Sequence, residues 1–369
     1  MQQEIPDHIY KIALTQIPGV GPVLAKNLLS YCGNVAAVFN DKVAHLSKIP
    51  GIGPHLAKTI HHYKNFDKAF AEHAFINKNN IQAIFFADDA YPQRLKHCAD
   101  GPVMLYYKGQ ANLNQSRMLA IVGTRMATDY GKAQTEKIIE TLLPFQPTIV
   151  SGLAYGIDVC AHKSALKNNL QTIAVLAHGL DRMYPAVHKS VADKMVHSGG
   201  LLTEYGQNTN PDRENFPARN RIVAGLCDAV IVIEAGVGGG ALITADLANG
   251  YNRDVFAIPG RVDDAASAGC NQLIKSNKAN LIESAADIVY LLGWKNEKQK
   301  QKTIQRNLFA EISKDEQMLV DLLSQQGAMN IDNLLAQNQL PASKIAALLL
   351  NLEFNGIVKS LPGKMFTLI

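Results

Sequence analysis

Short apolar runs that end in glycine recur through the middle of the chain. The runs are MLAIVG (118–123), TIVSG (148–152), TIAVLAHG (172–179), AVIVIEAG (229–236) and VFAIPG (255–260). Uninterrupted apolar and β-branched runs that alternate with helical patterns are typical of buried parallel strands covered by helices on both faces. The pattern predicts an α/β fold with a doubly wound, mostly parallel sheet. Its glycine-rich loops would meet at the carboxyl edge of the sheet, where such folds form their binding crevice.

An internal repeat marks residues 1–72 as a separate, all-α domain. The segment IPGVGP (17–22) returns as IPGIGP (49–54), and each copy runs into a helix rich in leucine and alanine. The glycines allow a tight turn that leaves backbone N–H groups free at a helix start, where an anion is favoured. The doubled pattern resembles tandem helix-hairpin-helix (SAM-like) domains, in which such turns grip a DNA phosphate. Two other interpretations stay open: the glycines only turn the chain between packed helices, or the domain docks a protein.

The carboxyl-terminal part has the pattern of another small domain. Residues 295–312 are polar and lack periodicity, which is typical of a linker, and they leave 73–294 as an extended α/β domain. In 313–369 three helical patterns precede an alternating tail, an order that resembles a winged-helix domain. Its candidate recognition helix, 341–355, has only two charged residues, Lys344 and Glu353, and is mostly apolar. This favours protein docking or self-association over the reading of a DNA groove.

Composition and charge restrict the functional classes. The formal net charge of the 369-residue chain is +4, and residues 295–306 alone carry that much. A nucleic-acid site therefore has to come from local arrangement and not from bulk charge. The five cysteines are scattered without a C-x-x-C pair, which argues against a disulfide framework and a structural metal. The sequence has neither a secretory leader pattern nor an apolar run of about 18 residues, so we expect a reduced, cytoplasmic protein without a membrane span.

Two of the predicted crevice loops carry an arginine two or three residues after a glycine. The loop GTR (123–125) ends a strand with free N–H groups followed by a guanidinium, a combination that suits phosphate oxygens. The other interpretation of Arg125 is an ion pair with a core carboxylate. The loop from Gly179 adds Arg182 and Tyr184, whose ring either stacks on a base or packs a rigid turn.

The remaining loops favour an anion chiefly through their backbone. The pair SG (151–152) opens a turn of small residues before Asp158, which we expect to cap the next helix. The segment RNR (219–221) concentrates positive charge at a helix start. The segment GVGGG (236–240) offers a nest of N–H donors, but it lacks the lysine of a Walker A loop, and the first loop does not match G-x-G-x-x-G. We therefore expect no nucleotide cofactor.

Taken in order, five motifs resemble the DprA (Smf) family, and the resemblance covers nearly the whole chain. They are GTR (123–125), SGLAYGID (151–158), GLDRMYP (179–185), FPARNR (216–221) and GGGALITA (238–245). The resemblance implies a Rossmann-like core that binds single-stranded DNA and dimerises. It also implies that the protein protects incoming strands and hands them to the RecA recombinase during natural transformation. One departure is GGGALIT (238–244) in place of the usual Ser-Gly-Ser-Leu-Ile-Thr, which removes hydroxyl groups that could contact phosphate.

Carried onto this sequence, the resemblance assigns DNA-binding positions and no catalytic residue. The positions are Gly123, Thr124, Arg125, Ser151, Gly152, Gly179, Arg182, Arg219, Asn220, Arg221 and Gly240. Two alternatives stay open. Related Rossmann-like enzymes hydrolyse nucleoside monophosphates with a loop whose glutamate is absent here, since Glu234 precedes the corresponding loop. A pure adaptor would have a vestigial crevice and no affinity for oligonucleotides.

Overall fold

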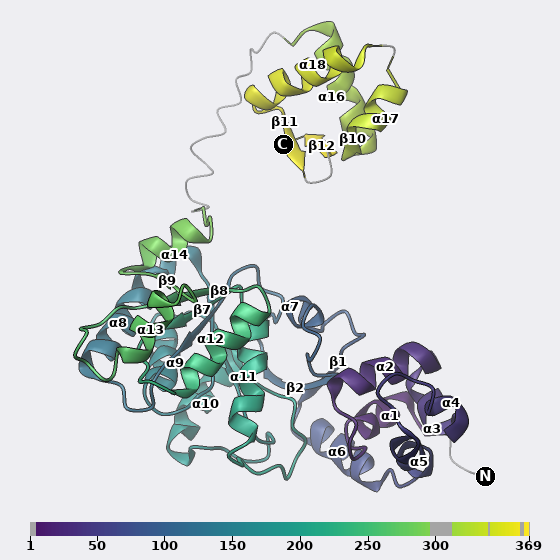
Figure 1. Ribbon diagram of the computed structural model, residues 1–369, viewed down its shortest axis with the longest axis vertical. Coiled ribbons are helices and arrows are strands. Elements are labelled where there is room, and N and C mark those ends of the chain that lie inside the picture. The colour runs from purple at the N-terminus through teal and green to yellow at the C-terminus, as the bar shows by residue number, and fades with distance from the viewer. Residues whose placement is uncertain (1–4, 296–311, 339, 362–364, 369) are drawn as a thin grey trace. The chain divides into compact units, whose positions relative to one another are not determined.

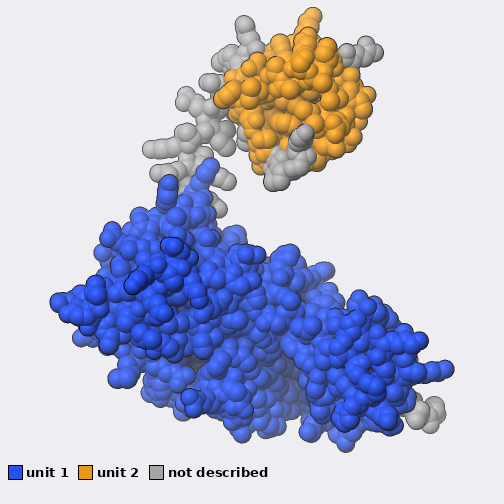
Figure 2. Space-filling model, viewed as in Figure 1, with its two compact units in different colours: residues 1–296 blue, residues 297–369 orange. Residues whose placement is uncertain are grey.

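The computed structural model describes residues 5–295, 312–338, 340–361 and 365–368. The chain forms two compact units, unit 1 (Met1–Asn296) and unit 2 (Glu297–Ile369) (Figure 2). Apart from its two end residues, the predicted linker at 295–312 lies outside the described residues. Within those described ranges, no helix has the length and apolar character needed to cross a membrane.

Unit 1 is built on a nine-stranded sheet with the order β1-β2-β6-β5-β4-β3-β7-β8-β9. The strands are β1 Gln82–Phe85, β2 Met104–Gly109, β3 Met118–Val122, β4 Thr148–Ser151, β5 Thr172–Val175, β6 Gly200–Thr203, β7 Ala229–Val232, β8 Asp254–Ala257 and β9 Asn280–Leu281. Strands β3 to β9 pair in parallel, whereas β1 and β2 pair antiparallel at one edge. The five glycine-ending runs form β3, β4, β5, β7 and β8, which confirms the predicted Rossmann-like, mostly parallel sheet.

Helices cover both faces of this sheet (Figure 1). One face carries α7 Gln93–Lys96, α11 Asn215–Leu226, α12 Gly240–Gly250 and α13 Ala268–Lys275. The other face carries α8 Asp129–Thr141, α9 Ile157–Lys167, α10 Lys189–Ser198 and α14 Ala285–Leu291. Alternate side chains of β3 enter the two cores, with Ala120 on the first face and Ile121 on the second. Because both faces are covered, every side chain of β3 is buried, and this explains its uninterrupted apolar sequence.

The amino-terminal helices form a domain that packs on the antiparallel edge of the sheet. They are α1 Asp7–Leu14, α2 Pro22–Cys32, α3 Val35–Asn40, α4 Val43–Leu46, α5 Pro54–His62 and α6 Asp67–Lys78. The two glycine repeats lead into α2 and α5, as predicted, and Gly19 and Gly51 take φ values of +81° and +82°. The helical core is continuous with Met104 and Tyr106 of β2. Lys26 donates to the carbonyl of Ala99 (3.1 Å), so it is engaged inside unit 1.

Unit 2 has the winged-helix fold predicted from its sequence. Its described elements are α16 Lys314–Gln326, β10 Met329–Asn330, α17 Ile331–Ala336, α18 Ala342–Phe354, β11 Val358–Leu361 and β12 Met365–Leu368. The strands form a sheet in the order β10-β12-β11. On α18, the candidate recognition helix, Lys344 pairs with Asp315, whereas Leu350 and Phe354 are 52% and 81% exposed. The exposed face of this helix is therefore mainly apolar.

Candidate nucleic-acid interface

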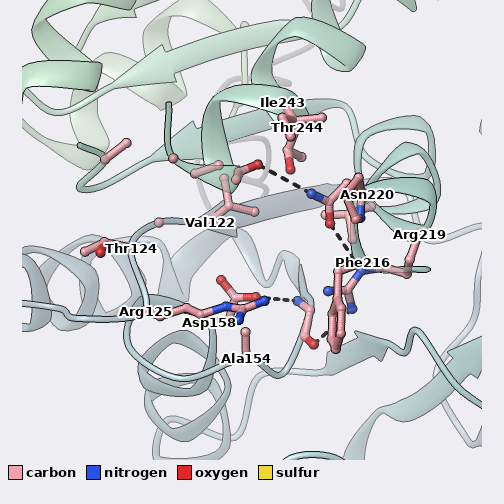
Figure 3. A pocket seen from close by; sticks show the side chains of 18 of the residues that line it. Val122, Thr124, Arg125, Ala154, Asp158, Phe216, Arg219, Asn220, Ile243 and Thr244 are labelled. Atoms are coloured by element: carbon pink, nitrogen blue, oxygen red, sulfur yellow. Dashed lines mark hydrogen bonds between the residues drawn. The ribbon is translucent and has the colours of Figure 1, made fainter. Parts of the chain in front are cut away.

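Loops from several neighbouring strands converge around a pocket of about 560 Å³ at the carboxyl edge of the sheet (Figure 3). The pocket lies where the strand order reverses, because β3 pairs with β4 on one side and with β7 on the other. The loops that follow these three strands contribute Gly123, Gly152 and Gly236 to its wall. Open parallel sheets bind their ligands at such a switch point, since the two loops diverge there and leave a crevice.

The loop after β3 is held in place by a buried glutamate at the end of β7. Glu234 is 0% exposed, and its carboxylate accepts hydrogen bonds from the backbone N–H (3.0 Å) and the hydroxyl of Thr128. Its own carbonyl accepts the N–H of Thr124 at 2.8 Å. Glu234 is therefore committed to positioning residues 124–128. It is absent from the lining of the pocket, where a general acid or base would have to lie.

Arg125 lies at the mouth of the pocket with its guanidinium 5.3 Å from the ring centroid of Phe216 (Figure 3). Arg125 is exposed, and none of the described carboxylates lies within ion-pair distance of it. The core ion pair considered from the sequence is therefore wrong. An arginine that rests on an aromatic face keeps its planar donors free along the rim of the ring. Such a group is available to an anionic ligand.

Beneath the mouth, two buried side chains of opposite charge, Asp158 and Arg219, form the floor of the pocket without touching each other directly. Asp158 and Arg219 are 7% and 4% exposed, and the Asp158 carboxylate accepts the N–H of Gly152 at 3.1 Å. Arg219 donates to the carbonyls of Gly152 (2.9 Å) and Val175. Burial raises the pKa of Asp158, and the charge of Arg219 opposes that rise. Burial also lowers the pKa of Arg219 to about 10, with Asp158 opposing, so the guanidinium remains protonated at neutral pH.

The predicted cap formed by Asp158 is wrong. Helix α9 begins after Gly156 without a side-chain cap, and the carboxylate turns back to Gly152 instead. A Cβ on Gly152 would lie 2.4 Å from Arg219 and 2.7 Å from Asp158. Glycine is therefore needed at position 152 so that these two side chains can pack against the backbone.

The start of α11 supplies the third wall. Phe216, Arg219 and Asn220 line the pocket, and the amide of Asn220 donates to the carbonyl of Gly240 (3.4 Å), which joins α11 to the start of α12. A Cβ on Gly240 would meet no atom within 4 Å, so the start of α12 faces open space. Free N–H groups at a helix start favour an anion. Backbone groups therefore support the guanidinium at this side of the pocket.

Seven of the predicted positions line the pocket, and four do not. Those that line it are Gly123, Thr124, Arg125, Gly152, Arg219, Asn220 and Gly240. The other four are Ser151, Gly179, Arg182 and Arg221, and each of them is used inside the protein.

The first two of these positions are buried. Ser151 is 0% exposed and donates its hydroxyl to the carbonyl of Ile121 at 2.6 Å. The N–H of Gly179 donates to Thr209, and a Cβ at 179 would lie 2.4 Å from the carbonyl of Gly206. Neither residue presents a donor to the pocket.

The two arginines outside the pocket already have partners. Arg182 donates to Asp181 (2.7 Å) and to Asn210. Arg221 pairs with Glu204, and each of the two side chains is 14% exposed. Residues 219 and 221 lie about 200° apart around α11, so both cannot face the same pocket.

Reasoning from the sequence missed Arg213 as a pocket residue. It is exposed, lines the pocket, and forms no ion pair among the described residues. Tyr184 and Phe216 are also in the lining, with ring centroids 5.8 Å apart, and Tyr184 is 43% exposed. The signal that could have revealed Arg213 is a cation three residues before Phe216, just ahead of the helix that enters the crevice. The mouth thus combines two aromatic rings with two guanidinium groups that form no ion pair in the part of the chain that the structure describes.

Comparison with known proteins places this chain in a family. The family model described as DNA recombination-mediator protein A matches residues 82–293. A SAM-like helix-hairpin-helix tandem matches residues 11–61, and a DprA winged helix domain matches residues 307–364. Protein Smf from Synechocystis sp. is 38% identical over 291 residues, which cover 78% of this chain and 73% of that protein.

Solved structures agree with this match. The X-ray structure of DNA processing protein A from Streptococcus pneumoniae has a TM-score of 0.64 and 35% identity, and covers 78% of this chain and 98% of that one. A structure of DNA processing protein A from Helicobacter pylori, described for its single-stranded DNA binding mode, has a TM-score of 0.52 and 30% identity. It covers 57% of this chain and 95% of that one. The resemblance predicted from the motifs is thereby confirmed, and the chain belongs to the DNA recombination-mediator protein A (DprA/Smf) family.

Proposed function

We propose that this chain binds the backbone of single-stranded DNA in the pocket at the carboxyl edge of its sheet. The observation that carries the proposal is the arrangement at the mouth, where Arg125 rests on Phe216 without a carboxylate partner among the described residues. Arg213 adds a second exposed guanidinium. The floor is already neutralised, because the charge of Arg219 is balanced by Asp158. The free charge is therefore concentrated where a strand would pass.

The aromatic rings of the pocket suit a single strand better than a duplex. Successive bases of a single strand are free to stack on aromatic side chains, and we assign that role to Tyr184 and Phe216. In a duplex the bases are already stacked and paired, so they cannot reach rings inside a pocket. Binding of this kind has little base preference, since every base has a π-face.

In the cell, we propose that the protein acts in the cytoplasm during natural transformation, protecting incoming strands and handing them to a RecA-type recombinase. The family relationship supports this role, and so does the Helicobacter pylori relative described for single-stranded DNA binding. We further propose a homodimer through the Rossmann-like domain. Light scattering of the free protein and co-precipitation with the recombinase on an oligonucleotide would test these two partnerships separately.

The test of DNA binding is a titration of labelled single-stranded and duplex oligonucleotides at several salt concentrations. We expect the single strand to bind more tightly and its affinity to fall as salt rises, because bound cations release counterions from phosphates. Arg125→Ala should weaken binding by about tenfold to a hundredfold, the range for a lost hydrogen bond to a charged group. It should also make the salt slope shallower by about one.

Arg261→Ala is the matched control for this substitution. Arg261 also lies in a loop that follows a parallel strand, its side chain is 84% exposed, and it is absent from the pocket lining. We expect it to leave affinity nearly unchanged. Equal affinity for duplex and single strand, or equal losses for the two arginine variants, would contradict the proposed site.

We assign no catalytic role to this pocket. Asp158, the carboxylate in the pocket lining, is buried and accepts the N–H of Gly152, and Glu234 lies outside the lining and holds Thr128. Incubation with nucleoside monophosphates and measurement of released base tests the alternative of a nucleotide hydrolase. Turnover that disappears in Glu234→Gln would overturn our assignment.

A further inference from the structure

One buried carboxylate of the amino-terminal domain contacts the α/β domain far along the sequence. Glu72, in the middle of α6, is 4% exposed, and its Oε2 accepts the backbone N–H of Gln207 at 2.8 Å. A Cβ on Gly206 would lie 2.9 Å from the same oxygen, so the backbone at 206–207 packs directly on the carboxylate. Burial raises the pKa of Glu72, the bond from Gln207 opposes the rise, and Asp181 adds to it. Such a position is costly for a carboxylate, which calls for a reason beyond the fold of α6.

The segment that Glu72 contacts is the connection between β6 and α11, residues 204–214. It is anchored at two further points, since the N–H of Asn208 donates to Asp181 (3.1 Å) and Arg182 donates to Asn210. Both of these anchors come from one neighbouring loop, which follows β5. Glu72 is the anchor supplied by the helical domain.

Beyond these anchors the same segment reaches the pocket. Pro211 and Arg213 line its wall, and Phe216 follows in the first turn of α11. Arg213 itself is exposed and has no ion pair among the described residues, so only the course of the backbone places its guanidinium at the mouth. A side chain held in this way depends on the anchors of its loop.

We propose that Glu72 is a positioning residue for the nucleic-acid pocket, through which the amino-terminal helical domain braces the 204–214 segment and sets the place of Arg213. This inference rests on the proposed binding of single-stranded DNA. It gives the helical domain a role that needs no contact with DNA by the glycine turns of its repeats. The acceptor oxygen carries this role, and the negative charge does not.

The experiment compares Glu72→Leu, Glu72→Gln and Asp67→Ala in the full chain. Leucine keeps most of the volume and removes the acceptor, glutamine keeps an acceptor oxygen without the charge, and Asp67 is an exposed carboxylate on the same helix. We expect Glu72→Leu to weaken binding of a labelled single strand by about threefold to tenfold, the range for one lost hydrogen bond. Glu72→Gln and Asp67→Ala should bind as the parent protein does.

Two further measurements separate positioning from a general loss of stability. Hydrogen exchange should rise in residues 204–214 of Glu72→Leu while β3 and β7 keep their protection. Glu72→Leu should also add almost nothing to the loss already caused by Arg213→Ala, because both changes remove the same contact. Arg125→Ala, in contrast, should combine additively with Glu72→Leu.

The outcomes are distinguishable. If the parent protein binds the single strand and Arg213→Ala weakens it, but Glu72→Leu binds normally or adds fully to Arg213→Ala, the positioning role is refuted while the proposed function stands. If the parent protein does not bind at all, both are refuted. If Glu72→Leu fails to fold, Glu72→Gln provides the test. Hydrogen exchange of residues 204–214 at the rate of the parent protein supports the role of the acceptor oxygen, and faster exchange refutes it.

Discussion

Replacing Asp158 by alanine should destabilise unit 1 strongly, because it leaves a buried guanidinium without its counter-charge. Asp158 and Arg219 are 7% and 4% exposed. The two opposite charges attract each other without a direct contact, and removing one partner of a buried pair in direct contact costs about 3–5 kcal/mol. Arg219 would keep its bonds to the carbonyls of Gly152 and Val175, so we expect a loss near the lower end of that range. The N–H of Gly152 would lose its acceptor as well.

Two further variants identify the origin of that loss. Asp158→Asn keeps the shape and one acceptor oxygen for Gly152, so it should cost less than alanine. Removing both charges with Asp158→Asn and Arg219→Met together should cost less than the sum of the two single changes, because neither partner is then left as an isolated buried charge.

Urea unfolding followed by tryptophan fluorescence measures these changes. The chain has one tryptophan, Trp294, which packs against Phe145 in unit 1 and so reports on that unit. Asp246→Ala is the control, because its pair with Lys278 is about half exposed and such pairs are worth about 0–1 kcal/mol. A loss below about 1 kcal/mol for Asp158→Ala, or strict additivity in the double variant, would refute the coupling of Asp158 to Arg219.

Three other predictions concern the loop, pH and the second unit. Gly156 has φ +76° and a Cβ there would lie 2.1 Å from the carbonyl of Thr124, so Gly156→Ala should displace the Arg125 loop and weaken single-strand binding in a titration. Burial lowers the pKa of His162 to about 3 from an ordinary value of 6.5. Below pH 6.5 the unfolded chain takes up a proton at His162 that the folded protein does not, so the free energy of unfolding should fall by about 1.4 kcal/mol per pH unit toward pH 3. Urea midpoints measured across this pH range should depend less steeply on pH in His162→Gln. Ending the chain after Lys295 should change affinity for a short oligonucleotide by less than about twofold, because the pocket lining lies in unit 1; a larger loss would show that unit 2 contacts DNA.

The sequence by itself determined the architecture and most of the loops around the pocket. Buried parallel strands require uninterrupted apolar runs, and β3, β4, β5, β7 and β8 were readable for that reason. The repeats before α2 and α5 and the order of elements in unit 2 were equally local signals. Strands β1, β2, β6 and β9 were not predicted, since none of them lies in an uninterrupted apolar run that ends in glycine, and β9 has only two residues.

Only the tertiary structure decided which side chains of those loops face the pocket. Arg219 and Arg221 are the same residue type two positions apart in the sequence. Because residues two apart point to nearly opposite sides of a helix, Arg219 lies in the floor of the pocket and Arg221 pairs with Glu204. The position of Arg213 just ahead of α11 was only a weak local signal, because its place depends on anchors that include Glu72 in another domain. The direction of a side chain depends on the packing of its element against distant parts of the chain, and periodicity along the sequence does not record that packing.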